Sequence, residues 1–335
     1  MKRRFGSHKM NRIKTMMIIV LLVAAMFVFV FFLTKEKSRE ATDMTAYTGA
    51  LEPRIGYVEL QVSDLENSVE FYQELIGFSI LKKDGNTAEL TADGVSPHLV
   101  LTQDDTFVER SPRTTGLYHL AILVPTRQDL ALSIVHLMES EYPLQGASDH
   151  QYSEALYLAD PDGNGIEIYT DRNSDEWIRD SSGGYVGATN PLDIESLLSE
   201  VKDAEWAGLS KGTRIGHMHL QASDLQASEK FYVEALGFDI VAQDSHMLFV
   251  SKDAYHHHIG MNTWAGNGIP KASENALGLK HFTFHLTEEE YDSAKAGLTE
   301  GNFQFEESDQ TVTVEDPSGV KLKLVLKTEL MEIDE

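Results

Sequence analysis

Residues 54–81 read RIGYVELQVSDLENSVEFYQELIGFSIL, and residues 214–241 read RIGHMHLQASDLQASEKFYVEALGFDIV. The second stretch repeats the first without a gap, so the chain contains an internal repeat. Each copy opens with alternating apolar and polar residues, which predicts a strand with one buried face. Ser63 or Asp64 can then cap a helix that Gly77 ends. The apolar residues of this helix recur at helical spacing: Leu65, Val69, Phe71, Tyr72 and Leu75.

A weaker repeat follows each strong copy. Residues 116–123 read GLYHLAIL and residues 278–285 read GLKHFTFH. Each ends much later in a DP-x-G turn and a strand, DPDGNGIEI at 160–168 and DPSGVKLKL at 316–324. The chain therefore divides into modules 1 to 4, each predicted to be βαβββ, which gives an α+β fold. A single module leaves one face of its curved sheet open, so two modules must pair to enclose a cleft.

The N-terminal region predicts a membrane anchor. Residues 16–33, MMIIVLLVAAMFVFVFFL, form an apolar run long enough to span a bilayer as a helix. The basic residues before it place the N-terminal tail in the cytoplasm and the globular part outside the cell. A cleaved signal peptide is the competing interpretation, but no small-x-small cleavage site follows the run. The predicted segments are a basic tail (1–15), the transmembrane helix (16–33), a linker (34–53), a first domain (54–171), a linker with a helix (172–212) and a second domain (213–328).

Composition restricts the chemistry. The chain has 335 residues, a formal charge of −25 and no cysteine. The absence of cysteine excludes disulfides, thiolate metal sites and a cysteine nucleophile, which leaves His, Asp and Glu as metal ligands. The acidity argues against a nucleic-acid partner, because phosphate binding needs clustered Lys and Arg. The sequence leaves the oligomeric state open.

Several motifs together resemble one family. They are SDLQASEKFYVEALGF at 223–238, DPDGNGIEIY at 160–169 and YHHHIGMNTWAG at 255–266. These residues resemble the vicinal-oxygen-chelate superfamily, which includes glyoxalases, bleomycin resistance proteins and extradiol dioxygenases, and in particular its catechol 2,3-dioxygenase-like branch of four-module proteins. The resemblance covers about residues 54–327 and implies two domains of that fold. It does not choose among the reactions that the fold supports.

Equivalent positions of the four modules predict where a metal binds. Modules 1 to 4 carry Tyr57, His119, His217 and His281 in the opening strand, and counting along the closing strand gives Leu99, Glu167, His258 and Lys323. An ammonium group cannot donate to a cation and repels it, so Lys323 excludes a metal from its module. We therefore expect modules 2 and 3 to face each other across the functional cleft and modules 1 and 4 to form a metal-free pair.

His119, Glu167 and His217 are the predicted metal ligands. Two histidines and one carboxylate leave open coordination positions, which suits Fe(II); Zn, Ni and Mn are the alternatives. The resemblance to dioxygenases implies an acid/base role for His258, with a fourth metal ligand as the alternative. The predicted substrate-binding residues are His219, His150, His257, Asn262 and Trp264, and His246 is a further candidate.

Three functions remain open at this level. The first is extradiol ring cleavage of a catechol-type diol with Fe(II) and O2. The second is a glyoxalase-like isomerase or lyase that uses Zn or Ni as a Lewis acid. The third is a non-catalytic exported protein that binds a small molecule in the same cleft.

Overall fold

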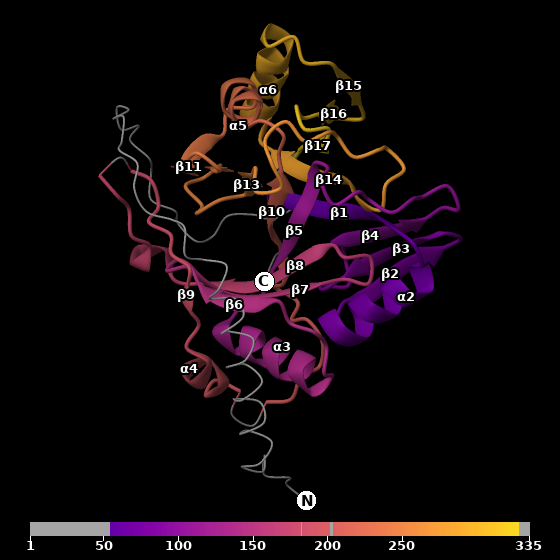
Figure 1. Ribbon diagram of the computed structural model, residues 1–335, viewed down its shortest axis with the longest axis vertical. Coiled ribbons are helices and arrows are strands. Elements are labelled where there is room, and N and C mark those ends of the chain that lie inside the picture. Colours follow the sequence, from indigo (N-terminus) through magenta and orange to yellow (C-terminus); the bar gives the residue numbers. More distant parts are fainter. Residues whose placement is uncertain (1–53, 182, 202–203, 328–335) are drawn as a thin grey trace, which may run out of the picture.

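The computed structural model describes residues 54–181, 183–201 and 204–327 (Figure 1). Among these residues, no helix combines the length and the apolar character that a membrane span requires. The predicted transmembrane segment, 16–33, lies outside the described residues. The membrane anchor therefore stays a prediction.

Two mixed sheets form the body of the molecule, as Figure 1 shows. The first sheet has the strand order β15-β16-β17-β14-β1-β4-β3-β2 and the second β11-β12-β13-β10-β5-β8-β7-β6-β9. Strands of the first sheet are β1 (Ile55–Val62), β2 (Ser79–Asp84), β3 (Thr87–Thr91), β4 (Leu99–Gln103), β14 (Gly278–Leu286), β15 (Phe305–Ser308), β16 (Thr311–Glu315) and β17 (Lys321–Leu326). Strands of the second are β5 (Gly116–Leu123), β6 (Gly146–Asp149), β7 (Ser153–Ala159), β8 (Gly165–Asp171), β9 (Asn190–Pro191), β10 (Arg214–Gln221), β11 (Asp239–Gln243), β12 (Met247–Ser251) and β13 (Ile259–Asn262).

Each sheet combines one module from each half of the chain. Modules 2 and 3 share the second sheet through the antiparallel pair β5 and β10, and modules 1 and 4 share the first through β1 and β14. This is the pairing that the sequence predicted. Within every module the opening strand lies parallel to the closing strand, as βαβββ connectivity requires. The domain boundaries 54–171 and 213–328 stay a prediction, because the sheets cross that division.

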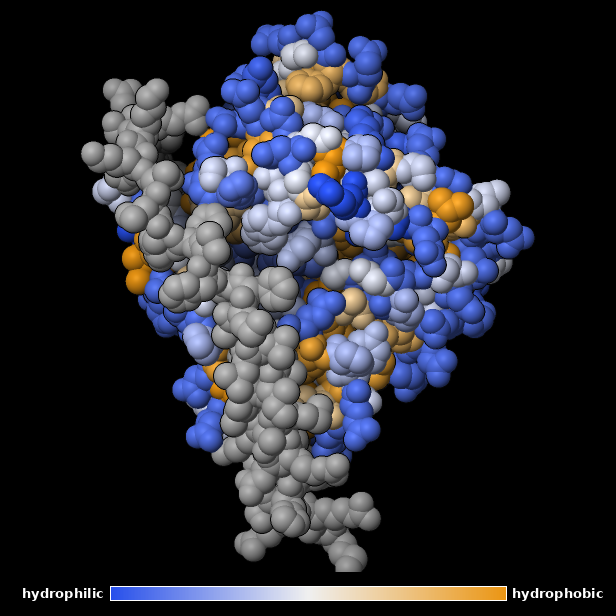
Figure 2. Space-filling model, viewed as in Figure 1, coloured by the Kyte–Doolittle hydropathy of each residue, from blue (hydrophilic) through white to orange (hydrophobic). Residues whose placement is uncertain are grey.

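The module helices cover the sheets from outside and bury their apolar faces in one core. They are α2 (Leu65–Glu70), η2 (Phe71–Ile76), α3 (Arg127–Glu139), α5 (Leu225–Glu229), η4 (Lys230–Ala235) and α6 (Glu288–Glu300), while η3 (Ser174–Glu176) and α4 (Ile194–Leu198) lie in the predicted linker. Over the face that Figure 2 shows, hydrophilic residues predominate and apolar patches are small.

The helix of module 1 begins and ends where the sequence predicted, but it changes type on the way. The Asp64 side chain accepts from the Asn67 backbone N–H and caps the start, and Gly77 ends the helix at a φ of 102°. From Phe71 onward the turns widen to a π-helix, and module 3 repeats this change at Lys230. Periodicity did not predict the π-turns, since they alter the spacing by one residue only.

The repeated helix carries a Phe-Tyr pair in modules 1 and 3, at residues 71–72 and 231–232. The tyrosine of each pair connects its helix to a turn of the other sheet. The Tyr72 hydroxyl donates to Asp160 Oδ2 at 3.0 Å, and the Tyr232 hydroxyl donates to Asp316 Oδ2 at 3.0 Å. Each aspartate opens a DP-x-G turn and also accepts backbone N–H groups of its own turn. Burial raises the pKa of both aspartates to about 6, although these hydrogen bonds oppose the rise. The Phe-Tyr pair and the DP-x-G turn, two motifs of the repeat, therefore contact each other through one buried hydrogen bond in each half of the chain.

We expect Tyr72→Phe and Tyr232→Phe each to lower the free energy of unfolding by about 1–3 kcal/mol, because each change leaves a buried acceptor short of a donor. Urea denaturation followed by circular dichroism measures the effect. Tyr118→Phe is the matched control, since Tyr118 is 40% exposed. If Tyr72→Phe and Tyr232→Phe have the same free energy of unfolding as Tyr118→Phe, the two tyrosine–aspartate hydrogen bonds do not stabilise the fold.

Candidate metal centre

Three side chains of the second sheet converge on one buried point. His119 on β5, Glu167 on β8 and His217 on β10 have ligand atoms within 4.8 Å of one another. Glu167 Oε2 lies 3.0 Å from His119 Nε2 and 3.2 Å from His217 Nε2. The three residues are 6%, 3% and 2% exposed, respectively. Modules 2 and 3 therefore contribute to a single cluster, as the sequence predicted.

Strand register explains why the two histidines share a face. In the antiparallel pair, His119 lies opposite His219, and His217 lies opposite Ala121. Shifts of register on either side of these pairs leave Tyr118 and Gly216 as extra residues. Such bulges bend a strand and turn neighbouring side chains. A side chain at Gly216 would overlap the Tyr169 hydroxyl, at 1.8 Å from the added Cβ, so only glycine fits the bulge in β10.

The electrostatics of the cluster keep its donor atoms available. Burial by itself would raise the pKa of Glu167, but the neighbouring imidazoles of His217 and His119 hold it well below its usual range. Burial lowers the pKa of His217 to about 4, although Glu167 opposes that change. At neutral pH the cluster thus presents a carboxylate and a neutral His217 imidazole, the forms that bind a metal.

The donor set fits a divalent cation. Ligand atoms about 2.0–2.2 Å from one ion and at right angles to one another lie about 3 Å apart, close to the separations found around Glu167. Among the described residues, His119 Nε2 has no hydrogen bond of good geometry, although it is buried. Two histidines and one carboxylate on one face constitute the arrangement typical of non-haem iron sites. His119, Glu167 and His217 therefore form a 2-His-1-Glu metal site.

The corresponding place in the first sheet has the opposite charge. Glu167 lies opposite Ala121, two residues after His119, and Lys323 lies opposite Thr283, two residues after His281. Burial, followed by the charge of Lys323, lowers the pKa of His281 to about 4. The His281 ring contacts the Tyr57 hydroxyl at 3.1 Å instead of a shared ion. Modules 1 and 4 thus lack the carboxylate that a metal needs at this position.

The same register corrects two positions from the sequence analysis. Gly260 lies opposite His219, two residues after His217, so Gly260 and not His258 corresponds to Glu167 in module 3. In module 1, Val100 rather than Leu99 occupies this position. The count was wrong because the closing strand of modules 1 and 3 has no DP-x-G turn from which to count.

His257 contacts the cluster more closely than His258 does. The His257 ring centroid lies 4.2 Å from that of His217 and 4.5 Å from that of Phe249. His258 Nδ1 instead contacts the Ser251 hydroxyl at 3.0 Å, and its ring packs against Phe284 of the first sheet. Burial lowers the pKa of both histidines well below its usual range. The acid/base role of His258 stays a prediction.

His150 reaches the cluster through a residue that the sequence analysis missed. Tyr157 Oη lies 2.6 Å from His150 Nε2, and the Tyr157 ring lies 5.8 Å from that of His119. His150 Nδ1 donates to the Ala188 carbonyl at 2.7 Å, and the Tyr157 hydroxyl also hydrogen-bonds to Glu167. Tyr157 lies on β7, opposite Glu167, and strand pairing was the only indication that could have identified it.

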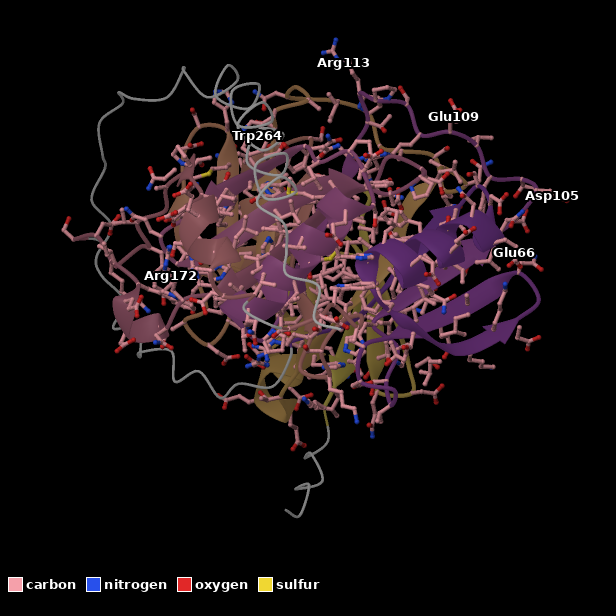
Figure 3. The ribbon with its side chains drawn as sticks, turned by 90° about the horizontal axis from the view of Figure 1, so that it is seen from below. Glu66, Asp105, Glu109, Arg113, Arg172 and Trp264 are labelled. Carbon is pink, nitrogen blue, oxygen red and sulfur yellow. The ribbon has the colours of Figure 1, made fainter. Side chains whose placement is uncertain are left out.

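An aromatic rim borders the cluster on the side of β5. The rim consists of Tyr118, Trp264 and His219, with Tyr118 5.0 Å from His219 and 5.2 Å from Trp264 between ring centroids. Asn262 Nδ2 donates to His219 Nε2 at 3.0 Å and so orients that ring. Trp264 is 52% exposed and reaches the surface, where Figure 3 labels it. His246 is exposed in the turn before β12.

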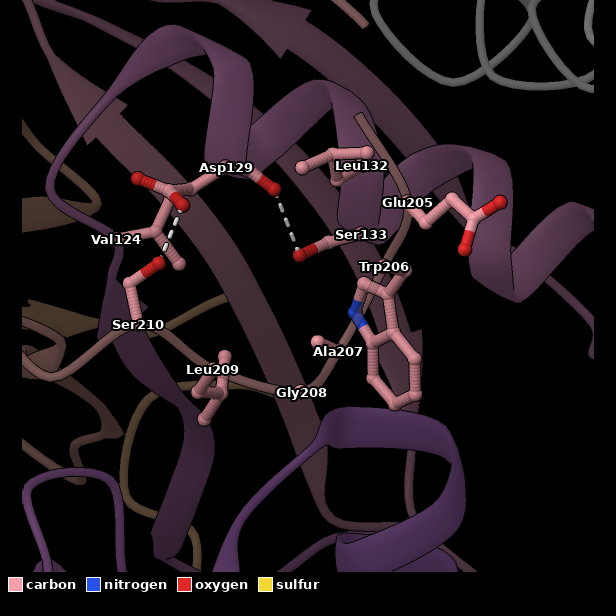
Figure 4. Close-up of a pocket in the computed structure, with 10 residues that line it drawn as sticks. All are labelled: Val124, Asp129, Leu132, Ser133, Glu205, Trp206, Ala207, Gly208, Leu209 and Ser210. Carbon is pink, nitrogen blue, oxygen red and sulfur yellow. Dashed lines mark hydrogen bonds between the residues drawn. The ribbon is translucent and has the colours of Figure 1, made fainter. Parts of the chain in front are cut away.

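A separate pocket of about 100 Å³ lies beside α3 (Figure 4). The Trp206 indole lines it and stacks on His136 with 3.4 Å between ring centroids. Ser210 donates to Asp129 across it. None of its lining residues belongs to the metal cluster. The pocket beside α3 is thus separate from the metal cluster, and the metal cluster is the candidate functional site.

We expect Glu167→Gln to lower metal content at least tenfold, because the amide brings no negative charge to the cation. Metal per chain is measured by mass spectrometry after dialysis. Lys323→Gln, at the corresponding position of the first sheet, is the matched control and should retain wild-type metal content. Retention of metal by Glu167→Gln with an unchanged fold would exclude the carboxylate as a ligand.

The pKa of His217 predicts how the stability of the metal-free protein depends on pH. The folded-state value is about 4 and the ordinary value is 6.5. Between these values the unfolded chain binds a proton that the folded chain does not, so the free energy of unfolding falls as the pH is lowered. In His217→Gln this contribution is absent, and urea denaturation with chelator at several pH values should show a shallower fall. Equal slopes would contradict the assignment.

Comparisons with known proteins agree with this geometry. The family model described as Glyoxalase/Bleomycin resistance protein/Dioxygenase superfamily matches residues 54–168 and 214–324. A catechol-2,3-dioxygenase of Bacillus subtilis (strain 168) is 44% identical over 280 residues, which cover 82% of this chain and 98% of that protein. Biphenyl-2,3-diol 1,2-dioxygenase 3 of Rhodococcus globerulus is 28% identical over 121 residues, which cover 36% of this chain and 64% of that protein.

Solved structures share the fold at low sequence identity. A putative dioxygenase from Bacillus subtilis subsp. subtilis str. 168 superposes with a TM-score of 0.57 at 12% identity, covering 81% of this chain and 84% of that chain. Glyoxalase I from Zea mays superposes with a TM-score of 0.50 at 17% identity, covering 82% of this chain and 92% of that chain. Because the family model matches both halves of the repeat, this chain belongs to the glyoxalase, bleomycin resistance protein and dioxygenase superfamily.

Proposed function

We propose that this protein is an Fe(II)-dependent extradiol dioxygenase that cleaves the ring of a catechol-type vicinal diol with O2. The observation that carries the proposal is the buried cluster of His119, Glu167 and His217. Only one face of a bound ion would be occupied by these three residues, which leaves positions for two diol oxygens and O2. The similarity to a catechol-2,3-dioxygenase over most of both chains supports the same reaction.

The bound ion would supply Lewis acidity toward the diol oxygens and the electrons of the redox step. The chain itself supplies the proton chemistry and the walls of the site. His257 lies against the ligand His217, and we assign proton transfer to it rather than to His258, whose ring packs on Phe284. A neutral, buried imidazole can accept a proton from a diol and return it to the product.

Tyr157 and the aromatic rim would orient the diol. The Tyr157 ring lies against His119, with the hydroxyl held by His150. Burial, followed by the nearby charge of Glu167, raises the pKa of Tyr157 well above its usual range, so the hydroxyl keeps its proton. Tyr118 and Trp264 present partly exposed rings on which an aromatic substrate can stack. The site therefore combines a charged centre with flat apolar surfaces.

We also propose, from the sequence alone, that the apolar run at 16–33 anchors the protein to a membrane with the globular part outside the cytoplasm. Such a location would place the enzyme where catechols arrive from outside. It would also require the ion to be kept reduced outside the cell.

Oxygen uptake on addition of catechol to the protein loaded anaerobically with Fe(II) tests the reaction. We expect a yellow ring-cleavage product and consumption of one O2 per catechol, because both oxygen atoms enter the product as the ring carbon bond next to the diol breaks. Glu167→Gln should be inactive and Lys323→Gln active. Zinc or nickel retention without oxygen uptake would favour the isomerase, and catechol binding without turnover would favour a binding protein.

A further inference from the structure

A chain of hydrogen bonds leads from a carboxylate to the histidine beside the metal ligands. Asp171 Oδ1 contacts His256 Nε2 at 2.8 Å, and His256 Nδ1 contacts His257 Nδ1 at 2.9 Å. Asp171 is the last residue of β8, the strand that carries Glu167, whereas both histidines lie in the loop before β13. The chain therefore connects module 2 to module 3 on the side of His217.

The chemistry of the donors fixes the direction of these hydrogen bonds. A carboxylate only accepts, so His256 Nε2 carries the proton that it shares with Asp171. A neutral His256 ring that donates from Nε2 has only a lone pair at Nδ1, and this nitrogen accepts. His257 therefore donates from Nδ1, and its Nε2 is left with a free lone pair.

The surroundings hold this arrangement rigid. The Tyr255 hydroxyl donates to the second oxygen of Asp171 at 2.9 Å and lies 2.7 Å from the Tyr169 hydroxyl. The Tyr152 ring stacks on His256 with 4.4 Å between centroids. The side chain of His256 is fully buried. Asp171 thus has both oxygens engaged and a fixed orientation, as a residue that orients another must have.

We propose that Asp171 and His256 are positioning residues: they fix the tautomer of His257, whose ring lies against that of the ligand His217, so that Nδ1 carries the proton and Nε2 does not. This inference rests on the proposed function for its catalytic consequence, but the tautomer itself does not depend on any reaction. A loop of three adjacent histidines would otherwise leave the proton of His257 free to occupy either nitrogen. The hydrogen bonds of Asp171 and His256 select one of these two positions for the proton.

Two substitutions of His256 separate this role from packing. His256→Gln keeps an N–H that can donate to Asp171 and an oxygen that can accept from His257, with the two atoms about as far apart as the ring nitrogens. His256→Phe keeps an aromatic ring against Tyr152 but removes both hydrogen bonds. A merely structural residue would tolerate Phe at least as well as Gln.

Kinetics of the Fe(II)-loaded full chain with catechol give the first measurement. We expect His256→Phe to lower kcat about 10- to 100-fold, with KM and iron content within about twofold of wild type, and His256→Gln to restore most of kcat. Asp171→Asn should lower kcat like His256→Phe, because the amide can offer a donor where His256 needs an acceptor. Equal loss in the Gln and Phe variants, or a wild-type kcat in His256→Phe, would overturn the proposal.

Nitrogen NMR of the metal-free chain, labelled with ¹⁵N-histidine, gives a measurement that needs no activity. In the wild-type protein and in His256→Gln we expect the Nδ1–H tautomer of His257, and in His256→Phe a mixture of both tautomers. An Nε2–H tautomer of His257 in the wild-type protein would overturn the proposal even if catechol is cleaved. Conversely, an inactive wild-type protein with the Nδ1–H tautomer would refute only the proposed function.

Discussion

The antiparallel pairing of β5 with β10 is the contact on which the metal site depends. It places His119 and His217 on one face and brings strands of modules 2 and 3 into the same sheet. A shift of one residue would turn every side chain of one strand to the other face and separate the two imidazoles. The bulge at Gly216 helps to fix this register, because the Tyr169 hydroxyl occupies the space where another residue would need its Cβ.

Charge then distinguishes two sheets of the same architecture. A buried carboxylate is costly unless cations or donors compensate it. In the second sheet two imidazoles surround Glu167, and a bound cation would complete the compensation. In the first sheet the corresponding residue is Lys323, and the nearby Glu59 pairs with Lys280 at 2.7 Å. One module pair is thus suited to a metal and the other needs none.

The internal repeat made the metal ligands predictable from the sequence. The other residues around the cluster could not be predicted, because they lie in loops or act through strand pairing. His119 and His217 stood at equivalent positions of two opening strands, and Glu167 stood in the closing strand of module 2, so comparison of the modules found them. The segment before β13 has no counterpart from which to count, and the adjacent histidines differ only in the side to which each turns. Tyr157 and Asp171 act through strand pairing and a loop contact, neither of which leaves a pattern in the sequence.

By itself, the sequence determined the βαβββ modules, the helix caps, the pairing of module 2 with module 3 and the three metal ligands. Periodicity and residue chemistry are local properties, and an internal repeat carries them from one module to the next. Only the tertiary structure decided which histidine lies against the ligands, which aspartate orients it and how the Phe-Tyr motif locks onto the DP-x-G turn. These contacts join residues far apart in the chain, and their distances depend on how the sheets twist and pack.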